Sequence, residues 1–174
     1  MPKFDQRNAE CRVFTFKEGV LSALAHDLEL DIGRFTIEIS DELAVDATFA
    51  AGSVTVLHAI KNGRPVPMSD GDKRKIERNI VDDVLDTRRY PEIRFRAAKA
   101  TPAGDGFVLA GELSLHGKTR PLEIKTQLAN GRQVAEVTLQ QPDFGIKPYS
   151  AMLGALKIRA AVKVRLALAW PPGS

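Results

Sequence analysis

Alternation of apolar and polar residues constrains the fold of this chain more than any other feature of its sequence. In residues 26–32, the even positions hold His26 and three aliphatic residues, and the odd positions are acidic. After Gly33-Arg34 the alternation resumes in residues 35–39, and it recurs at 54–56, 93–97, 107–115, 122–128 and 158–168. A period of two is typical of a β-strand with one buried face and one solvated face. We interpret 26–32 and 35–39, around Gly33, as an antiparallel hairpin.

Turn signals separate most of these runs. With Arg12–Phe16 and Gln133–Leu139 the chain has about nine strand candidates. Residues 101–106, His116-Gly117 and Asn130-Gly131 have the Gly, Pro, Asn and Asp composition of hairpin turns. Many short alternating strands with little helix between them predict a sandwich or a barrel.

One segment has a helical period instead. Between Ser69 and Thr87, apolar residues fall at positions 76, 80, 81, 84 and 85. Asp70 and Asp72 favour a helix start, and Pro91 disfavours helix in the residue before it. We expect one amphipathic helix over about 70–87. It would pack across the barrel or over an opening rather than stand free to bind a partner, because such a narrow apolar stripe is usually core.

A second irregular segment, about 141–156, is apolar and rich in Gly and Pro. A loop this hydrophobic must cover something or be covered. We interpret it as a flap, with a helical turn near Met152, lying against the barrel mouth.

Composition excludes several classes of protein. The 174 residues suit one domain, 1–174, and the net charge of +3 is too small and too evenly spread for a nucleic-acid binder. The basic run Lys73-Arg74-Lys75 lies between acidic residues and is typical of a solvated surface.

Residues 1–10 are polar, so we expect a loosely attached or disordered N-terminus with no signal peptide. No stretch approaches the roughly 20 apolar residues of an integral membrane segment. The single cysteine, Cys11, cannot form an intrachain disulfide. A cytoplasmic location is therefore expected.

The sequence contains no recognisable catalytic or metal-binding set. His26, His58 and His116 lie far apart, without the local spacing of zinc ligands. His26 and Asp27 are adjacent, but neighbouring strand residues face opposite sides of a sheet. No nucleophile elbow, P-loop or dinucleotide fingerprint occurs. We expect a protein without enzymatic activity, bound metal or cofactor.

Four pieces of sequence resemble the YceI-like family. They are 25–28 with 33–35, then 90–95, then 111–122, and finally Asp143-Phe144-Gly145-Ile146. They occur in the family's order and span most of the chain. The resemblance implies a mainly β protein, an eight-stranded antiparallel barrel of lipocalin-like form with one helix, whose interior holds a long isoprenoid chain.

That resemblance and the alternation together suggest a binding or carrier protein for an isoprenoid, quinone-like or similar lipophilic molecule. The candidate ligand-binding residues are inward positions and flap residues: His26, Leu28, Leu30, Phe35, Ile37, Phe95, Leu113, Phe144, Ile146, Lys147, Tyr149, Met152, Leu153, Ile158 and Val162. Lys147 and Tyr149 could meet a phosphate or quinone head group, and His26 could hydrogen-bond a carbonyl.

Two alternatives stay open at this point. One is a ligand-free structural or interaction barrel, which could form a homodimer through its sheet edges or flap. The other is a barrel enzyme acting on a lipophilic substrate, with His26 as acid or base.

Overall fold

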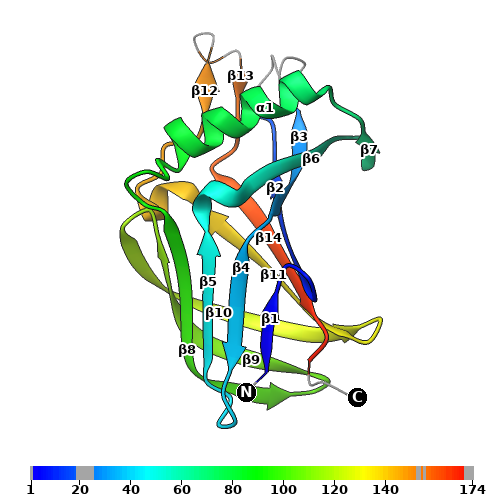
Figure 1. Ribbon diagram of the computed structural model, residues 1–174, viewed down its shortest axis with the longest axis vertical. Coiled ribbons are helices and arrows are strands. Elements are labelled where there is room, and N and C mark those ends of the chain that lie inside the picture. Colours follow the sequence, from blue (N-terminus) through cyan, green and yellow to red (C-terminus); the bar gives the residue numbers. More distant parts are fainter. Residues whose placement is uncertain (1, 19–25, 152–153, 155, 171–174) are drawn as a thin grey trace.

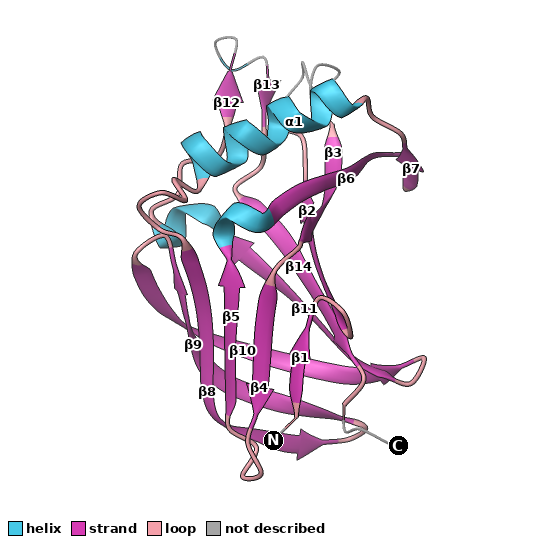
Figure 2. Cartoon of the chain, in the orientation of Figure 1, coloured by secondary structure: helices cyan, strands magenta, loops and turns pink. Residues whose placement is uncertain are grey.

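The computed structural model describes residues 2–18, 26–151, 154 and 156–170, and these form a curled antiparallel sheet with helices at one end (Figures 1 and 2). The strands are β1 (Lys3–Asp5), β2 (Ala9–Thr15), β3 (Asp27–Ile32), β4 (Phe35–Ile39), β5 (Val45–Ala50), β6 (Val54–Lys61), β7 (Arg64–Val66), β8 (Glu92–Ala103), β9 (Gly106–Leu115), β10 (Lys118–Ala129), β11 (Arg132–Gln140), β12 (Ser150–Ala151), β13 (Leu156–Lys157) and β14 (Ala161–Leu168). The helical segments are η2 (Ala51–Ser53), α1 (Asp70–Arg78), η3 (Asn79–Val84) and η4 (Gln141–Phe144).

The order of the strands requires the sheet to close on itself. Twelve strands follow the order β1-β4-β5-β8-β9-β10-β11-β14-β2-β3-β6-β7, and β12 and β13 form a separate pair. β3 and β4 are separated only by Gly33 and Arg34, yet they lie near opposite ends of this order. β5 and β6, which flank η2, do the same. Each pair is one long strand, bent in the middle and shared by both ends of the sheet.

The expected hairpin around Gly33 is therefore wrong. β3 pairs with β2 and β6, whereas β4 pairs with β1 and β5. Neither Gly33 nor Arg34 has the positive φ of a two-residue reversal. Instead the Gly33 N–H donates to the carbonyl of Ser53, 3.0 Å away, in the partner bent strand. This segment bends and continues rather than turning back.

The barrel class is as expected. When each bent strand is counted once and the short strands β1 and β7 are set aside, eight antiparallel strands of the described chain surround one hydrophobic core. β14 closes the wall by pairing with both β11 and β2, with Leu168 opposite Ala9. The turns at His116-Gly117 and Asn130-Gly131 have positive φ at both residues, which matches the hairpin turns predicted there.

The helix lies where its period predicted. The Ser69 hydroxyl accepts the Asp72 N–H at 3.1 Å and caps α1. After Arg78 the helix widens into the π-helical segment η3, and the Leu85 N–H bonds to the carbonyl of Ile80, five residues earlier, at 2.8 Å. The helical residues Ile76, Ile80, Val84 and Leu85 pack against the core.

The N-terminus differs from its expectation. β1 pairs with β4, and Phe4 is only 6% exposed within the core. Residues 3–5 and 9–10 thus belong to the sheet, joined by a turn, rather than being loosely attached, because β1 covers the edge of β4 while Phe4 adds to the buried apolar surface. Among the described residues, no helix is long and apolar enough to cross a membrane.

Candidate ligand-binding cavity

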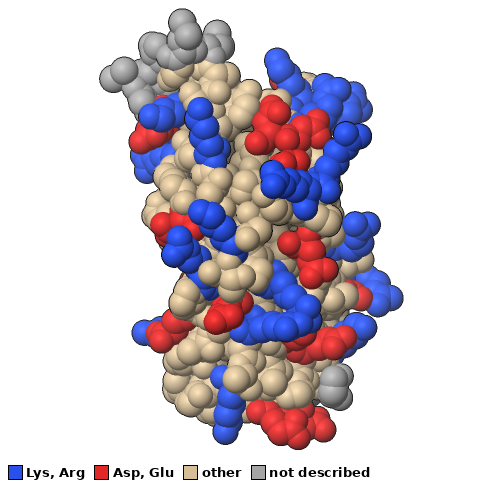
Figure 3. Space-filling model, turned by 90° about the vertical axis from the view of Figure 1, so that its left-hand side faces the viewer, with Lys and Arg blue, Asp and Glu red and all other residues tan. Residues whose placement is uncertain are grey.

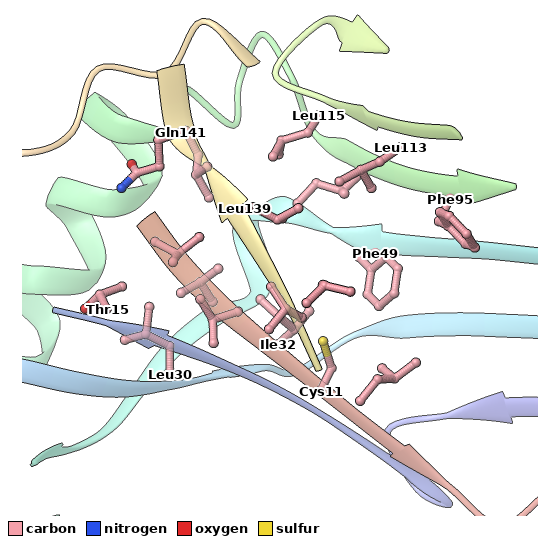
Figure 4. A pocket seen from close by; sticks show the side chains of 18 of the residues that line it. Cys11, Thr15, Leu30, Ile32, Phe49, Phe95, Leu113, Leu115, Leu139 and Gln141 are labelled. Atoms are coloured by element: carbon pink, nitrogen blue, oxygen red, sulfur yellow. The ribbon is translucent and has the colours of Figure 1, made fainter. Parts of the chain in front are cut away.

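A cavity of about 660 Å³ occupies the interior of the barrel. This volume falls in the range of ligand pockets, which is roughly 300 to 1,000 Å³. Every long strand of the wall contributes inward-facing side chains, and Figure 4 shows several of them pointing into the space, among them Leu30, Ile32, Phe49, Leu113 and Leu139. The lining is chiefly Leu, Ile, Val, Phe and Ala. Such a surface suits a slender apolar molecule.

One end of the cavity, which we call the base, is closed. There the rings of Phe107 and Trp170 lie with their centroids 4.2 Å apart. Beside them, the Thr126 hydroxyl accepts the Phe107 N–H at 3.0 Å and donates to Gln133 Oε1 at 2.7 Å. Gln133 Nε2 then donates to the carbonyl of Asp105 at 2.9 Å. This network joins β9, β10, β11 and the β8–β9 turn, so that buried polar groups and apolar rings seal the base together.

The opposite end, which we call the open end, lies under α1, with β12 and β13 nearby (Figure 1). Glu77 Oε1 accepts the Val56 N–H of β6 at 2.9 Å, next to a β-bulge. On the other side, Asn79 Nδ2 donates to the Tyr149 hydroxyl at 3.2 Å. These two side-chain hydrogen bonds attach the helix to the strands and to the flap across the cavity mouth.

Polar lining groups gather at this open end. The Thr15 hydroxyl oxygen is buried and has no hydrogen-bond partner in the described part of the chain. Tyr149 accepts from Asn79 and keeps its own O–H free to donate. Gln141 lines the cavity too, while its Nε2 donates to the carbonyl of Arg159 at 3.1 Å. His26, Asp72 and Lys75, which are exposed, complete the lining at the rim. The cavity is thus apolar along its length. At the base the polar lining residues Thr126 and Gln133 are hydrogen-bonded to each other, whereas at the open end the Thr15 and Tyr149 hydroxyls keep hydrogen-bonding capacity for a ligand.

Cys11 is a structural thiol within the lining. Burial, with a smaller contribution from the negative charge of Asp31, raises its pKa to about 12. The thiol therefore stays protonated at neutral pH and acts as a small apolar group. It offers no nucleophile to the cavity.

Eleven of the fifteen candidate residues line this cavity. They are His26, Leu28, Leu30, Ile37, Phe95, Leu113, Phe144, Ile146, Tyr149, Ile158 and Val162. Two lie elsewhere: Phe35 is buried behind the lining and stacks on Phe49 at 5.7 Å, and Lys147 is exposed outside the cavity. Phe35 follows the alternation of β4 and is buried on the same face as the lining residues Ile37 and Ile39, but it packs against Phe49 instead of lining the cavity. Met152 and Leu153, with the expected helical turn near Met152, lie outside the described residues.

Besides further inward-facing wall residues such as Ile32, Phe49 and Leu139, sequence reasoning missed three kinds of lining residue. The helical residues Ile76, Ile80, Val84 and Leu85 were assigned to a covering helix but not to the site, although their apolar stripe was visible. Thr15 and Gln133 were missed because polar residues on an alternating strand give no sign of facing inward, and Gln141 because it begins the irregular segment η4. Trp170 follows the last strand and has no periodic signal, so only the fold brings it to the base.

The described residues hold no group of three or more His, Cys, Asp or Glu side chains placed to bind a metal ion. His58 pairs with Glu29, with Nε2 and Oε2 2.7 Å apart, and His116 packs on Tyr90 with ring centroids 4.4 Å apart. The expectation of no catalysis stays a prediction.

Comparison with known proteins places this fold. The sequence model of the YceI-like domain matches residues 8–170. The chain belongs to the YceI-like family. BcnA of Burkholderia cenocepacia is a similar solved structure, with TM-score 0.64, 12% identity and coverage of 92% of this chain and 94% of that one. A polyisoprenoid-binding domain from Saccharophagus degradans, implicated in plant cell wall breakdown, gives TM-score 0.60 at 12% identity over 95% and 94%. At 12% sequence identity, these structural similarities show a shared fold and do not identify a ligand. Comparison with curated protein sequences gives no match.

Proposed function

We propose that this YceI-like protein binds and carries a long lipophilic molecule, of the isoprenoid or quinone class, inside its barrel. The observation that carries the proposal is the cavity of about 660 Å³, apolar along its length, closed at the base by a hydrogen-bonded network and an aromatic pair, and carrying hydroxyls with spare hydrogen-bonding capacity at its open end. The Saccharophagus degradans domain, described as polyisoprenoid-binding, has a similar fold and supports this class of ligand.

The apolar lining supplies the affinity. Each buried methylene contributes about 0.8 kcal/mol, so an isoprenoid tail gains strongly from the cavity without any polar contact. The tail points to the base, near Phe107 and Trp170. The head lies at the open end, where the Thr15 and Tyr149 hydroxyls offer hydrogen bonds to a carbonyl, hydroxyl or quinone oxygen. Specificity then depends on tail length and on those few polar groups.

Organic extraction and native mass spectrometry of the protein purified without detergent test the proposal. We expect a long-chain lipid at near-stoichiometric amount. In Val137→Trp the added indole occupies the cavity, so the lipid should be lost. The matched control Thr138→Trp places the same side chain on the exposed outer face of β11 and should keep it. A folded wild-type protein without lipid, or equal lipid in both variants, contradicts the proposal.

The single tryptophan supplies a second readout. Trp170 lies at the base of the cavity. Titration with a long-chain quinone should quench its fluorescence in a saturable, one-to-one manner, whereas a short water-soluble quinone should quench weakly and without saturation. If the two quinones behave alike, the tail does not reach the base.

Two further parts of the proposal concern the role of the protein. We propose that it acts without catalysis, and His26→Ala should then leave the extracted ligand chemically unchanged. We also propose a cytoplasmic location, supported by a chain with one cysteine, whose thiol is buried. Cell fractionation checks the location. A lipid-free protein that sediments as a dimer would instead favour an interaction barrel.

A further inference from the structure

Basic side chains are distributed unevenly over the barrel. Residues 61–78 and 144–160 together contain nine Lys and Arg but only three Asp and Glu. The remainder of the chain keeps sixteen of the 25 basic residues and nineteen of the 22 acidic ones, so its net charge is negative. All of the excess positive charge therefore belongs to these two segments, whose nine Lys and Arg side chains we call the basic rim.

The fold brings the basic rim to the open end of the cavity. The first segment includes β7 and α1, the second includes β12 and β13, and all four elements lie at that end (Figure 1). Eight of the nine side chains belong to exposed residues, and Lys73 is half-buried. On the face in Figure 3, basic side chains border an acidic group near this end. Asp82 and Asp83 belong to η3, which follows the basic part of the helix in the sequence.

The basic rim is also less neutralised than the barrel wall. Outside the basic rim, seven of the sixteen Lys and Arg residues form an ion pair, as in Arg94–Asp46 at 2.8 Å and Lys3–Glu38 at 3.4 Å. Within the described residues, Lys157 alone of the basic rim forms an ion pair, with Glu18 at 3.8 Å. The other rim charges are free to meet an external anion.

One exposed apolar residue accompanies these charges; the other large one of the described chain, Leu128, lies in the wall strand β10. Val66 of β7 is 38% exposed between Pro65 and Pro67, next to Arg64. A basic surface with exposed apolar residues is typical of proteins that bind at a membrane interface. Each Lys or Arg near an anionic leaflet strengthens binding roughly fivefold, and the effect falls off within a Debye length. The proposed ligand also favours membrane binding, because isoprenoids and quinones with long tails reside in membranes.

We propose that the basic rim docks the open end of the barrel onto an anionic membrane surface, so that the cavity mouth faces the lipid. The purpose of docking rests on the proposed function, but the docking itself can be tested without any ligand. The geometry commits to a lipid bilayer because the charged surface surrounds the entrance of an apolar cavity.

Cosedimentation with vesicles tests the proposal. The wild-type protein should bind vesicles of phosphatidylcholine mixed with phosphatidylglycerol, fail to bind phosphatidylcholine alone, and dissociate at high salt. The double variant Arg74→Glu/Arg78→Glu changes two exposed rim residues outside the cavity lining. It should weaken vesicle binding at least tenfold while keeping its extracted lipid and melting temperature.

The matched control is Lys99→Glu/Lys125→Glu, which makes the same change in net charge on exposed wall positions of β8 and β10. It should weaken binding by less than threefold. Equal losses in both double variants, equal binding to neutral vesicles, or equally tight binding to a DNA duplex would overturn docking. Vesicle binding by a lipid-free protein would contradict the proposed function and leave docking intact. Lipid in the cavity without vesicle binding would support the proposed function and overturn docking.

Discussion

The two ends of the barrel are closed by different means. At the base, Thr126 and Gln133 join three strands and a turn through buried hydrogen bonds, and the Phe107–Trp170 pair fills the space beside them. At the open end, a helix crosses the mouth and is attached by the side chains of Glu77 and Asn79. The base is thus built from the strands of the sheet themselves, whereas the open end is covered by a helix that packs onto the strands.

This difference assigns separate tasks to the two ends. Opening the base would break strand pairing and expose buried polar groups, which is costly. Displacing the helix would break two side-chain hydrogen bonds and expose the apolar residues that pack on the core, but it would leave the strand ladder intact. The polar lining and the basic rim lie at this second end as well. Stability therefore depends mainly on the base, and exchange of a ligand would use the end under α1.

The largest expected effect comes from Gly106 at the base. A Cβ at this position would lie 1.9 Å from the carbonyl oxygen of Thr126, so Gly106→Ala forces β9 and β10 apart. We expect a loss of more than about 4 kcal/mol in the free energy of unfolding, measured by urea denaturation. Gly71→Ala in α1 is the control, because nothing lies within 4 Å of its Cβ. It should change stability by less than about 1 kcal/mol. Similar losses of stability in the two variants would contradict the conclusion that stability depends more on the base than on the helix at the open end.

Removal of the aromatic closure should be nearly as damaging. Trp170 is 8% exposed, and Trp170→Ala leaves a void against Phe107. We expect a loss of about 3 to 5 kcal/mol. Trp170→Phe keeps a ring in contact with Phe107 and should lose about 1 to 2 kcal/mol. Thermal unfolding of both variants measures the difference. An unaltered Trp170→Ala protein would mean that the base does not depend on this pair.

Loss of the hydrogen bond that attaches α1 should reduce stability less than the two changes at the base. Glu77→Ala removes the acceptor of the buried Val56 N–H and should cost about 1 to 3 kcal/mol. Glu77→Gln keeps an acceptor oxygen and should cost less. Hydrogen exchange should speed up at Val56 and along α1 in the Ala variant, while the amides of β10 and β11 stay protected. Faster exchange at both ends would show that the helix and the base open together.

The smallest effect concerns the ion pairs of the wall. Arg94 donates two hydrogen bonds to Asp46, at 3.0 and 2.8 Å, and these bonds lower the pKa of that carboxyl. The ionised form is favoured in the native state, so this contribution is present above the ordinary aspartate pKa of about 3.9 and is lost as the pH falls below it. Because the side chain of Asp46 is 42% exposed, Asp46→Asn should cost less than about 1 kcal/mol at pH 7. The difference from wild type should vanish near pH 2; a constant difference would exclude this ion pair as its cause.

Much of the wall could be predicted from the sequence because strand alternation is a local property. In β3 the even-numbered residues are buried and lie on the cavity side, as their period indicated. The helix was recognisable because Ser69, Asp70 and the apolar stripe act over a few residues.

Long-range contacts explain the errors. Gly33 bends rather than reverses the chain because Ser53, twenty residues later, accepts its N–H. Phe4 is ordered by β4, and Trp170 reaches the base by contact with Phe107. The basic rim likewise joins two segments that are far apart in sequence, each unremarkable by itself.

The pairing of β14 with β2 also governs how the protein can be made. Leu168 lies opposite Ala9, so the wall joins two strands that lie far apart in the sequence. During synthesis on the ribosome, β2 must wait without this partner until β14 has emerged. Such non-local closure is entropically costly and folds slowly, with apolar strands exposed in the meantime. Production of this barrel therefore calls for protection of the nascent chain, by chaperones or by slow expression at low temperature.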